Sequence, residues 1–239
     1  MISLIALTMW RYPPFLDFLE YVIELPVIGE VILINNNARE TPDHRVLKHP
    51  KLRMQSFEEN IFVCPAWNLA VKMSKFDRIC FLNDDVIVDL KIFLAANRFM
   101  DTNKDFGCLG IEPGVKPDQH KVTDGVLEIV EWKDVENAYG FAWIFFMLKE
   151  NYIETPEEIK LFYSDTINLV GQSIRKKINY FVRNCFFYTP NDGVGCATTS
   201  KLVQSEKFPV YMVFPGVNNE DIAYKKWEEE FRKQHSELQ

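Results

Sequence analysis

The sequence has little of several features that would assign its class directly. Its five cysteines are widely spaced, with no Cys-x-x-Cys pair and no histidine nearby, which argues against a disulfide framework or a zinc site and favours a cytoplasmic location. No apolar run approaches the ~20 residues that a membrane span needs, so any membrane association is expected to be peripheral. Basic residues are outnumbered 27 to 34, and the net charge of -7 argues against nucleic acid as a partner, because that partner needs a positive field.

The first half of the chain alternates between apolar runs and segments with helical spacing. The run at 2–8 has no basic residues before it and is stopped by two prolines, so it predicts a first strand rather than a signal peptide. Further strands are expected at 31–34, 52–55 and 78–82, with helices over 15–23 and 65–73. This alternation predicts an α/β fold with a mostly parallel central sheet flanked by helices, whose ligands lie beyond the carboxyl ends of the strands.

The second half of the sequence is less regular. The 239 residues, 47% of them hydrophobic, suffice for one large domain. The expected elements are a helix at 90–100, strands at 106–111, 127–132, 140–148 and 178–188, a short helix starting at Pro156, a helix capped by residues 163–166, loops at 112–124 and 189–200, and a charged helix at 218–238 with Trp227 and Phe231 on one side.

The stretch from Arg78 to Asp89 carries the clearest chemical signal. A buried-type strand ends abruptly in Asn83-Asp84-Asp85, and apolar sequence resumes at once. An Asn-Asp turn accounts for the asparagine and one aspartate. It does not account for a second adjacent carboxylate, which repels the first unless a cation compensates both. Asp89 precedes a helical segment and is expected to cap it.

Taken in order, these segments resemble the GT-A fold glycosyltransferases, in particular the short bacterial, phage and viral members of the inverting family two. The resemblance covers about residues 1 to 200 and is most specific before Asp85. It rests on these segments: Val-Ile-Leu-Ile-Asn-Asn at 31–36, Asn60, Pro-Ala-Trp-Asn-Leu-Ala at 65–70, Phe-Leu-Asn-Asp-Asp-Val at 81–86, and Ser-Asp at 164–165. It implies one domain over 1–239, in which 1–111 bind the nucleotide sugar, 112–200 form the acceptor side with a small antiparallel sheet, and 201–239 form a C-terminal tail and helix.

The resemblance also implies site residues and a reaction. Asp85 is the expected ligand of Mn²⁺ or Mg²⁺, and Asn83 and Asp84 are expected at the ribose or sugar of a nucleotide-diphosphate sugar, with a UDP-sugar favoured. Asp165 is the expected base that takes a proton from the acceptor hydroxyl. One of the glutamates between 154 and 158 is the alternative base.

Further contacts follow from the ends of the expected strands. Thr8, Asn35 and Asn37 are expected to line the nucleotide pocket, and Asn68 to contact the donor or brace the metal loop. Acceptor contacts are expected from Trp143 and Ser164, on a glycan or another molecule with a hydroxyl group. The aromatic residues that are candidates for stacking on a sugar, although each is more often a core residue, are Trp67, Tyr139, Phe141 and Trp143.

The sequence departs from the family at two places. Asparagines at 35–37 stand where relatives usually place an acid, and no histidine lies at 189–192, where relatives often complete the metal site; Asn191 or Asp192 is a candidate substitute. Two other functions stay open, and these departures favour the second of them. One is a sugar-nucleotidyltransferase, although no glycine-rich phosphate loop follows the first strand. The other is a carbohydrate-binding module that has lost catalysis.

Overall fold

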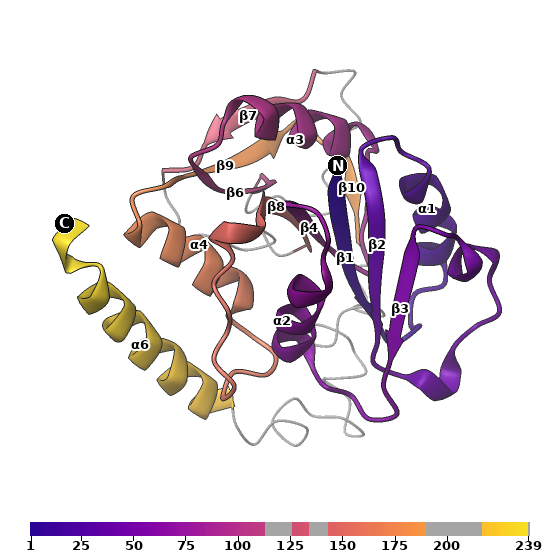
Figure 1. Ribbon diagram of the computed structural model, residues 1–239, viewed down its shortest axis with the longest axis horizontal. Coiled ribbons are helices and arrows are strands. Elements are labelled where there is room, and N and C mark those ends of the chain that lie inside the picture. Colours follow the sequence, from indigo (N-terminus) through magenta and orange to yellow (C-terminus); the bar gives the residue numbers. More distant parts are fainter. Residues whose placement is uncertain (113–125, 134–142, 190–216, 239) are drawn as a thin grey trace.

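The computed structural model of the chain describes residues 1–112, 126–133, 143–189 and 217–238, and an eight-stranded sheet runs through it (Figure 1). The strands lie in the order β3-β2-β1-β4-β8-β6-β9-β7. Neighbours pair in parallel except where β8 lies between β4 and β6 and where β7 joins β9. The bounds are β1 Ile2–Thr8, β2 Ile28–Asn35, β3 Leu52–Ser56, β4 Arg78–Asn83, β6 Phe106–Ile111, β7 Glu128–Glu131, β8 Ile144–Leu148 and β9 Ile178–Arg183.

A second, two-stranded antiparallel sheet lies beyond β4. It pairs β5 (Ile87–Val88) with β10 (Phe187–Tyr188). The mostly parallel central sheet, the flanking helices and the small antiparallel sheet confirm the predicted fold class.

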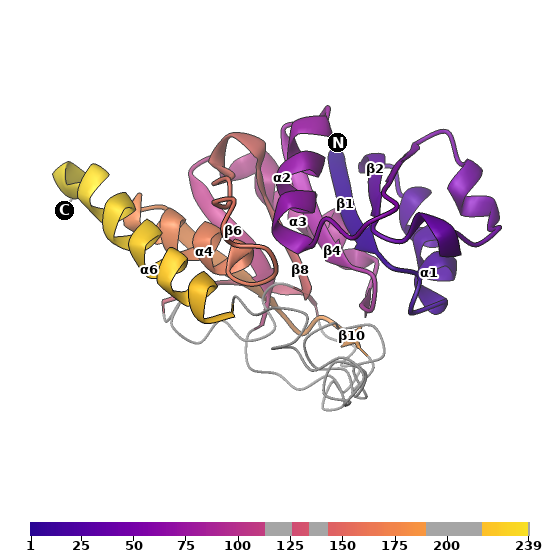
Figure 2. The ribbon, with the colours of Figure 1, turned by 90° about the horizontal axis from the view of Figure 1, so that it is seen from below.

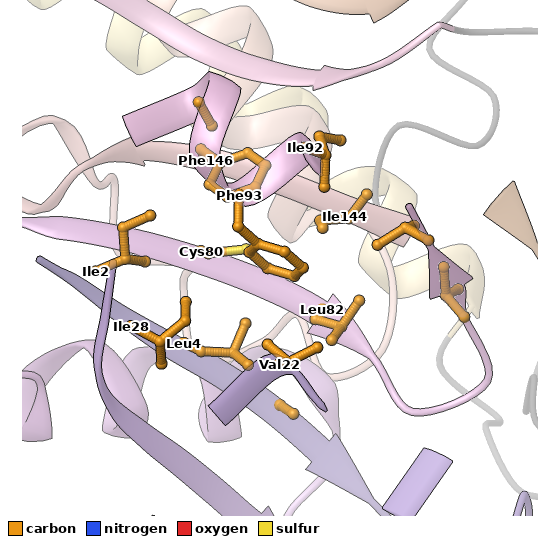
Figure 3. Packing of buried hydrophobic residues seen from close by; sticks show 14 of the residues in the cluster. Ile2, Leu4, Val22, Ile28, Cys80, Leu82, Ile92, Phe93, Ile144 and Phe146 are labelled. Atoms are coloured by element: carbon orange, nitrogen blue, oxygen red, sulfur yellow. The ribbon is translucent and has the colours of Figure 1, made fainter. Parts of the chain in front are cut away.

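Helices cover both faces of the central sheet. Apolar side chains of α1 (Pro14–Ile23) and α3 (Lys91–Thr102) pack on one face, where Phe93 of α3 lies in one cluster with Cys80 of β4 and Phe146 of β8 (Figure 3). On the other face, α2 (Val63–Met73) and α4 (Ser164–Ile174) pack on the sheet. The inner strands are mostly apolar because both of their faces are buried.

The C-terminal helix α6 (Val217–Gln234) lies outside α4 rather than on the sheet, as Figures 1 and 2 show from two sides. Phe231 of α6 is buried in a third apolar cluster with Ile167 and Ile174 of α4, and Trp227 packs against that cluster. The expected placement of Trp227 and Phe231 on one side of the helix is therefore confirmed. Among the helices in the described part of the chain, none is long and apolar enough to cross a membrane.

Two expected elements are wrong. The short helix expected at Pro156 is a turn: the Lys160 N–H, which a helix would bond to the Pro156 carbonyl, donates to Glu220, and the Thr155 backbone bonds to the Asn68 side chain. The single strand expected at 178–188 is two strands. Asn184 has a φ of 61°, which breaks the extended backbone and sends β10 to pair with β5.

The other expected elements that lie in the described residues are confirmed, with shifts of up to four residues at their ends. Asp89 also acts as expected: its carboxylate accepts a hydrogen bond of 2.9 Å from the backbone N–H of Lys91 at the start of α3. Residues 140–142 of the expected strand at 140–148, and most of the two expected loops at 112–124 and 189–200, lie outside the described residues.

Candidate functional site

Asp84 and Asp85 lie at the carboxyl end of β4, in the turn that follows Asn83. Asp85 is only 3% exposed. Burial raises the pKa of Asp85 to about 6, and burial together with the neighbouring charge of Asp85 raises the pKa of Asp84 to about 7. No basic side chain within the described ranges lowers either pKa. Two desolvated carboxylates side by side without a positive partner are a suitable place for a cation.

The end of β1 supports this acid pair. The Thr8 hydroxyl and the Met9 backbone N–H both donate to Asp84, which lowers its pKa against the effect of burial. Thr8 is opposite Asn35 of β2 in the sheet register, and its carbonyl accepts a 2.8 Å bond from the backbone N–H of Asn36. The carboxyl ends of β1, β2 and β4 therefore meet around Thr8, as the sequence predicts for a parallel sheet.

Two polar atoms beside Thr8 are buried and have no hydrogen-bond partner among the described residues. They are the indole N–H of Trp10 and the side-chain oxygen of Asn36, which is 6% exposed. Buried polar groups are nearly always paired, so an orphaned donor and an orphaned acceptor at the same edge of the sheet indicate a ligand that pairs with them. Sequence reasoning missed both residues; the only signal was their position directly after strands β1 and β2.

Asn35 and Asn37 have a different environment from Asn36. The Asn35 amide donates to Thr41 at 2.7 Å and to Ser56 at 3.2 Å, and its oxygen accepts a 2.9 Å bond from the backbone N–H of Asn37. The Asn37 amide donates to Glu40 at 2.8 Å. These bonds fix the loop after β2, and Asn35 is fully buried.

Asn68 joins α2 to the segment that leads into α4. Its oxygen accepts bonds from the Tyr152 hydroxyl at 2.7 Å and the Thr155 backbone N–H at 3.1 Å, and its amide donates to the Thr155 carbonyl at 2.9 Å. These bonds hold the segment that leads into α4, and the two predicted roles of Asn68, contact to the donor and bracing of the metal loop, stay predictions.

Asp165 lies in the first turn of α4 and is partly exposed. Burial raises the pKa of its carboxylate, while the backbone N–H and hydroxyl of Thr166 lower it. The position of Asp165 relative to the acid pair follows from the topology. The strands β4, β6 and β9 run in the same direction. Helix α4 packs on β6 and β9, and a short connection joins the end of α4 to the start of β9, so α4 runs opposite to these strands. The first turn of α4 therefore lies toward the same edge of the sheet as Asp84 and Asp85.

The residues predicted at the acceptor differ in how deeply they are buried. Ser164 is 3% exposed, and its hydroxyl accepts a 2.9 Å bond from Thr155. The ring of Trp143 is partly buried, with its centroid 4.9 Å from that of Phe187 on β10. Trp67 is a core residue, packed on Phe81 with ring centroids 4.5 Å apart.

Two tyrosines that the sequence did not single out lie beside the acid pair. Burial, Tyr188 and Asp85, in that order, raise the pKa of Tyr12, so these three side chains are neighbours. Tyr188 is 45% exposed. The remaining candidates from the sequence lie outside the described residues: Tyr139, Phe141, Asn191 and Asp192.

A divalent cation at this site would have few protein ligands. The described residues contain no group of three or more His, Cys, Asp or Glu side chains that could hold a metal ion. The donor set is the Asp84–Asp85 pair, which fits a hard cation that takes most of its remaining ligands from phosphate oxygens and water.

Comparison with solved structures identifies the architecture. The chain is similar to TarS of S. aureus, residues 1–349, with a TM-score of 0.59 and 17% identity over 81% of this chain and 61% of that one. The TarS structure in complex with UDP-GlcNAc matches with a TM-score of 0.58. The mannosyltransferase PcManGT from Pyrobaculum calidifontis, in complex with GDP-Man and Mn²⁺, matches with a TM-score of 0.55 and 13% identity over 79% of this chain and 54% of that one.

These similarities concern the fold. No protein-family description and no curated protein matches the sequence, and the chain spans about three fifths of the length of the TarS fragment. The strand order, the two sheets and the structural matches agree, and the chain has the GT-A glycosyltransferase fold.

Proposed function

We propose that the chain is an inverting glycosyltransferase that uses Mn²⁺ or Mg²⁺ to transfer a sugar from a nucleotide-diphosphate sugar to a hydroxyl group. The observation that carries this proposal is the pair of desolvated carboxylates, Asp84 and Asp85, at the carboxyl edge of a GT-A sheet. The ligands in the similar structures, UDP and UDP-GlcNAc in TarS and GDP-Man with Mn²⁺ in PcManGT, support the donor class. A UDP-sugar is the favoured donor.

Asp85 is the proposed metal ligand, and Asp84 or Asn83 the proposed contact to the donor ribose or sugar. When bound, a divalent cation neutralises the charge that develops on the pyrophosphate leaving group. The protein's part is to orient the Asp84–Asp85 pair, and the hydrogen bonds from Thr8 and Met9 orient Asp84 and favour its ionised form against the effect of burial. Protonation of either carboxylate competes with the cation, so the raised pKa values make cation binding dependent on pH near neutrality.

The nucleotide is proposed to lie over the ends of β1 and β2. There Thr8 faces the donor, and Trp10 and Asn36 offer an unpaired donor and an unpaired acceptor to the edge of a base. Asn35 and Asn37 hold the loop that carries Asn36, and Asn68 braces the segment before α4. The predicted donor set therefore divides into residues that would touch the donor and residues that position its binding loop.

Asp165 is the proposed catalytic base. Its carboxylate lies at the start of α4, toward the edge that holds the acid pair, and burial raises its pKa toward the range where a carboxylate accepts a proton effectively. The acceptor is proposed to be a glycan or another molecule with a hydroxyl group. Aromatic surface for it is offered by Trp143 and Tyr188 on the acceptor side, with Ser164 as a buried neighbour of Asp165. The described cysteines are buried free thiols, which is consistent with the proposed cytoplasmic location.

Two substitutions test the roles of the carboxylates separately. Calorimetric titration of UDP-sugars, with and without Mn²⁺, should show that Asp85→Asn loses the metal-dependent part of donor affinity. Asp165→Asn should keep donor affinity and lower the transfer rate by about 100-fold or more, the range expected for loss of a general base. Asp105→Asn is the matched control, because Asp105 is an exposed aspartate before β6, at the opposite edge of the sheet. Metal-independent, unchanged donor affinity in Asp85→Asn would refute the metal site.

A further inference from the structure

Glu220, near the start of α6, is a buried carboxylate with an unusual set of partners. It is 2% exposed, and it accepts hydrogen bonds from three successive backbone N–H groups. The bonds run from Lys160 at 2.8 Å and Phe162 at 3.1 Å, and from Leu161 at 3.2 and 3.4 Å to the two oxygens. Three consecutive N–H groups that converge on one carboxylate form an anion-binding concavity in the backbone. The segment 160–162 is therefore shaped around a side chain from a helix 58 to 60 positions later in the sequence.

The same segment is held from its other side by the start of α2. The backbone N–H of Cys64 donates to the Lys160 carbonyl at 2.9 Å, and the Cys64 thiol donates to the Phe162 carbonyl at 3.2 Å. Residues 160–162 thus have backbone donors bonded to α6 and backbone acceptors bonded to α2. A segment fixed on both sides has little freedom to move the residues that follow it.

The residues that follow are Tyr163, Ser164 and Asp165. Tyr163 has a φ of 70°, a left-handed conformation that a bulky residue adopts only when its surroundings impose it. The Tyr163 hydroxyl donates to Asp221, the neighbour of Glu220, and its ring stacks on Tyr224 of α6 with centroids 4.6 Å apart. From this turn α4 starts at Ser164, which places Asp165 in its first turn. The orientation of Asp165 therefore depends on contacts with α6.

We infer that Glu220 is a positioning residue for Asp165: by fixing segment 160–162 and the turn at Tyr163, it holds the base of the proposed transfer reaction in its productive orientation. The inference rests on the proposed function for the role of Asp165, and on the contacts of α6 for the role of Glu220. Glu220 itself is buried under segment 160–162 and does not touch substrate. It acts only through the backbone that it binds.

The donor side of the site does not share these contacts. Asp84 and Asp85 are positioned by β4 and by the end of β1, and neither bonds to segment 160–163 or to α6 within the described residues. Loss of the Glu220 clamp should therefore lower kcat and leave donor affinity unchanged. Misplacing a catalytic group by about 1 Å costs up to about 100-fold in rate, so a 10- to 100-fold loss of kcat is expected.

The pH profile gives a readout that general loosening of the fold would not change in the same way. Burial holds the pKa of Asp165 above its ordinary value, and within the described residues the titratable groups that interact with it are the thiols of Cys64 on α2 and Cys108 on β6. Both thiols have raised pKa values and stay neutral near pH 7. If segment 160–163 loosens, the partly exposed Asp165 becomes more accessible to water, its pKa falls, and the acid limb of the kcat profile moves to lower pH.

The experiment uses Glu220→Gln and Glu220→Ala in the full chain, with Glu229→Gln as the matched control because Glu229 is an exposed glutamate on the same helix. Amide hydrogen exchange at residues 160–162 should be faster in both Glu220 variants than in the wild type and the control, and this readout needs no enzymatic activity. Glutamine keeps one acceptor oxygen, so Glu220→Gln should retain the fold and show the smaller effects. Thermal unfolding of each variant confirms that it is folded before kinetics are measured.

The outcomes separate this inference from the proposed function. Faster exchange, a 10- to 100-fold lower kcat, unchanged donor affinity and an acid limb at lower pH together support the role of Glu220. Unchanged exchange, or an unchanged kcat and pH profile in a folded Glu220→Gln variant, overturns it, as does a parallel loss of donor affinity and kcat. Full transfer activity in Asp165→Asn would instead overturn the assignment of Asp165 as the base, whatever the Glu220 variants show.

Discussion

Asp84 and Asp85, in the proposed metal and donor site, illustrate how a residue placed for binding can act against the stability of the protein that carries it. The pKa values of both carboxylates are raised well above the ordinary value of 3.8, mainly by burial. Because the folded chain holds these protons to higher pH than the unfolded chain does, the free energy of unfolding of the cation-free protein falls as pH rises from about 4 to about 7. Their contribution is most favourable below pH 4 and is lost as pH passes through the raised pKa values.

Asp85→Asn should therefore stabilise the cation-free protein at high pH only. Asparagine stays neutral, so the cost of burying a charge at position 85 disappears, and the melting temperature in EDTA should exceed that of the wild type by roughly 5 °C at pH 8. At pH 4.5 Asp85 is largely protonated in the folded protein, and the difference should nearly vanish. Thermal unfolding at both pH values, with Asp105→Asn as control, makes the measurement. An equal difference at both values would contradict it.

The asparagines show what the sequence could not resolve at the level of single residues. Asn35, Asn36 and Asn37 are indistinguishable as a run of letters, and the sequence predicted Asn35 and Asn37 as the donor contacts. In the structure those two are bonded to Thr41, Ser56 and Glu40, and Asn36 is the one with an unpaired oxygen. Asn35 and Asn37 are held by partners 3 to 21 positions away, from Glu40 to Ser56, and the run of three asparagines does not reveal which of them finds such partners.

At the scale of elements, the close approach of α4 to the sheet depends on Gly107 of β6. A methyl group at position 107 would lie 2.4 Å from the side-chain oxygen of Asn179 and 2.6 Å from the Cβ of Gln172. That Asn179 oxygen already accepts a 2.9 Å bond from the Cys108 backbone N–H, and the Asn179 amide donates to Leu169 of α4. The three elements β6, β9 and α4 therefore share one tightly packed junction.

Gly107→Ala should destabilise this junction. Overpacking of a well-filled core typically costs about 1–3 kcal/mol, and a loss of that size is expected in the free energy of unfolding, measured by urea titration. Glu229→Gln, an exposed substitution on α6, should change it by less than about 0.5 kcal/mol. A Gly107→Ala protein as stable as the control would show that α4 can move away from β6 without cost.

Elements with their own periodic pattern were predictable from the sequence. The strands β1, β2 and β4 and the helices α1 and α2 are such cases, because local spacing decides which side chains are buried. The turn at Pro156 was not predictable, because side-chain bonds to its backbone decide it. The division of the expected strand into β9 and β10 was not predictable either, because one residue at positive φ, Asn184, causes it. The contact of Glu220 with segment 160–162 was also unpredictable, because it joins positions about sixty apart with no charge pattern to mark either.

For the whole molecule, the choice between transferase and sugar-nucleotidyltransferase depends on which ligand binds the native state. A ligand that binds only the folded chain raises its stability by about 2.7 kcal/mol at 100 times its Kd, or roughly 5–10 °C for a chain of this size. UDP-sugars with Mn²⁺ should give such a shift. Nucleoside triphosphates should give a smaller one, because no glycine-rich phosphate loop follows β1.

A thermal-shift panel of nucleotide sugars, nucleoside diphosphates and nucleoside triphosphates, each with Mn²⁺ or with EDTA, makes this comparison. Chelation should abolish most of the shift, because Asp84 and Asp85 repel a pyrophosphate that arrives without a cation, and the net charge of -7 adds to that repulsion. Asp85→Asn is the matched variant: it should lose the Mn²⁺-dependent part of the shift. Stabilisation by a triphosphate and by no nucleotide sugar would favour a nucleotidyltransferase, and a sugar-dependent shift that EDTA leaves intact would favour a binding module.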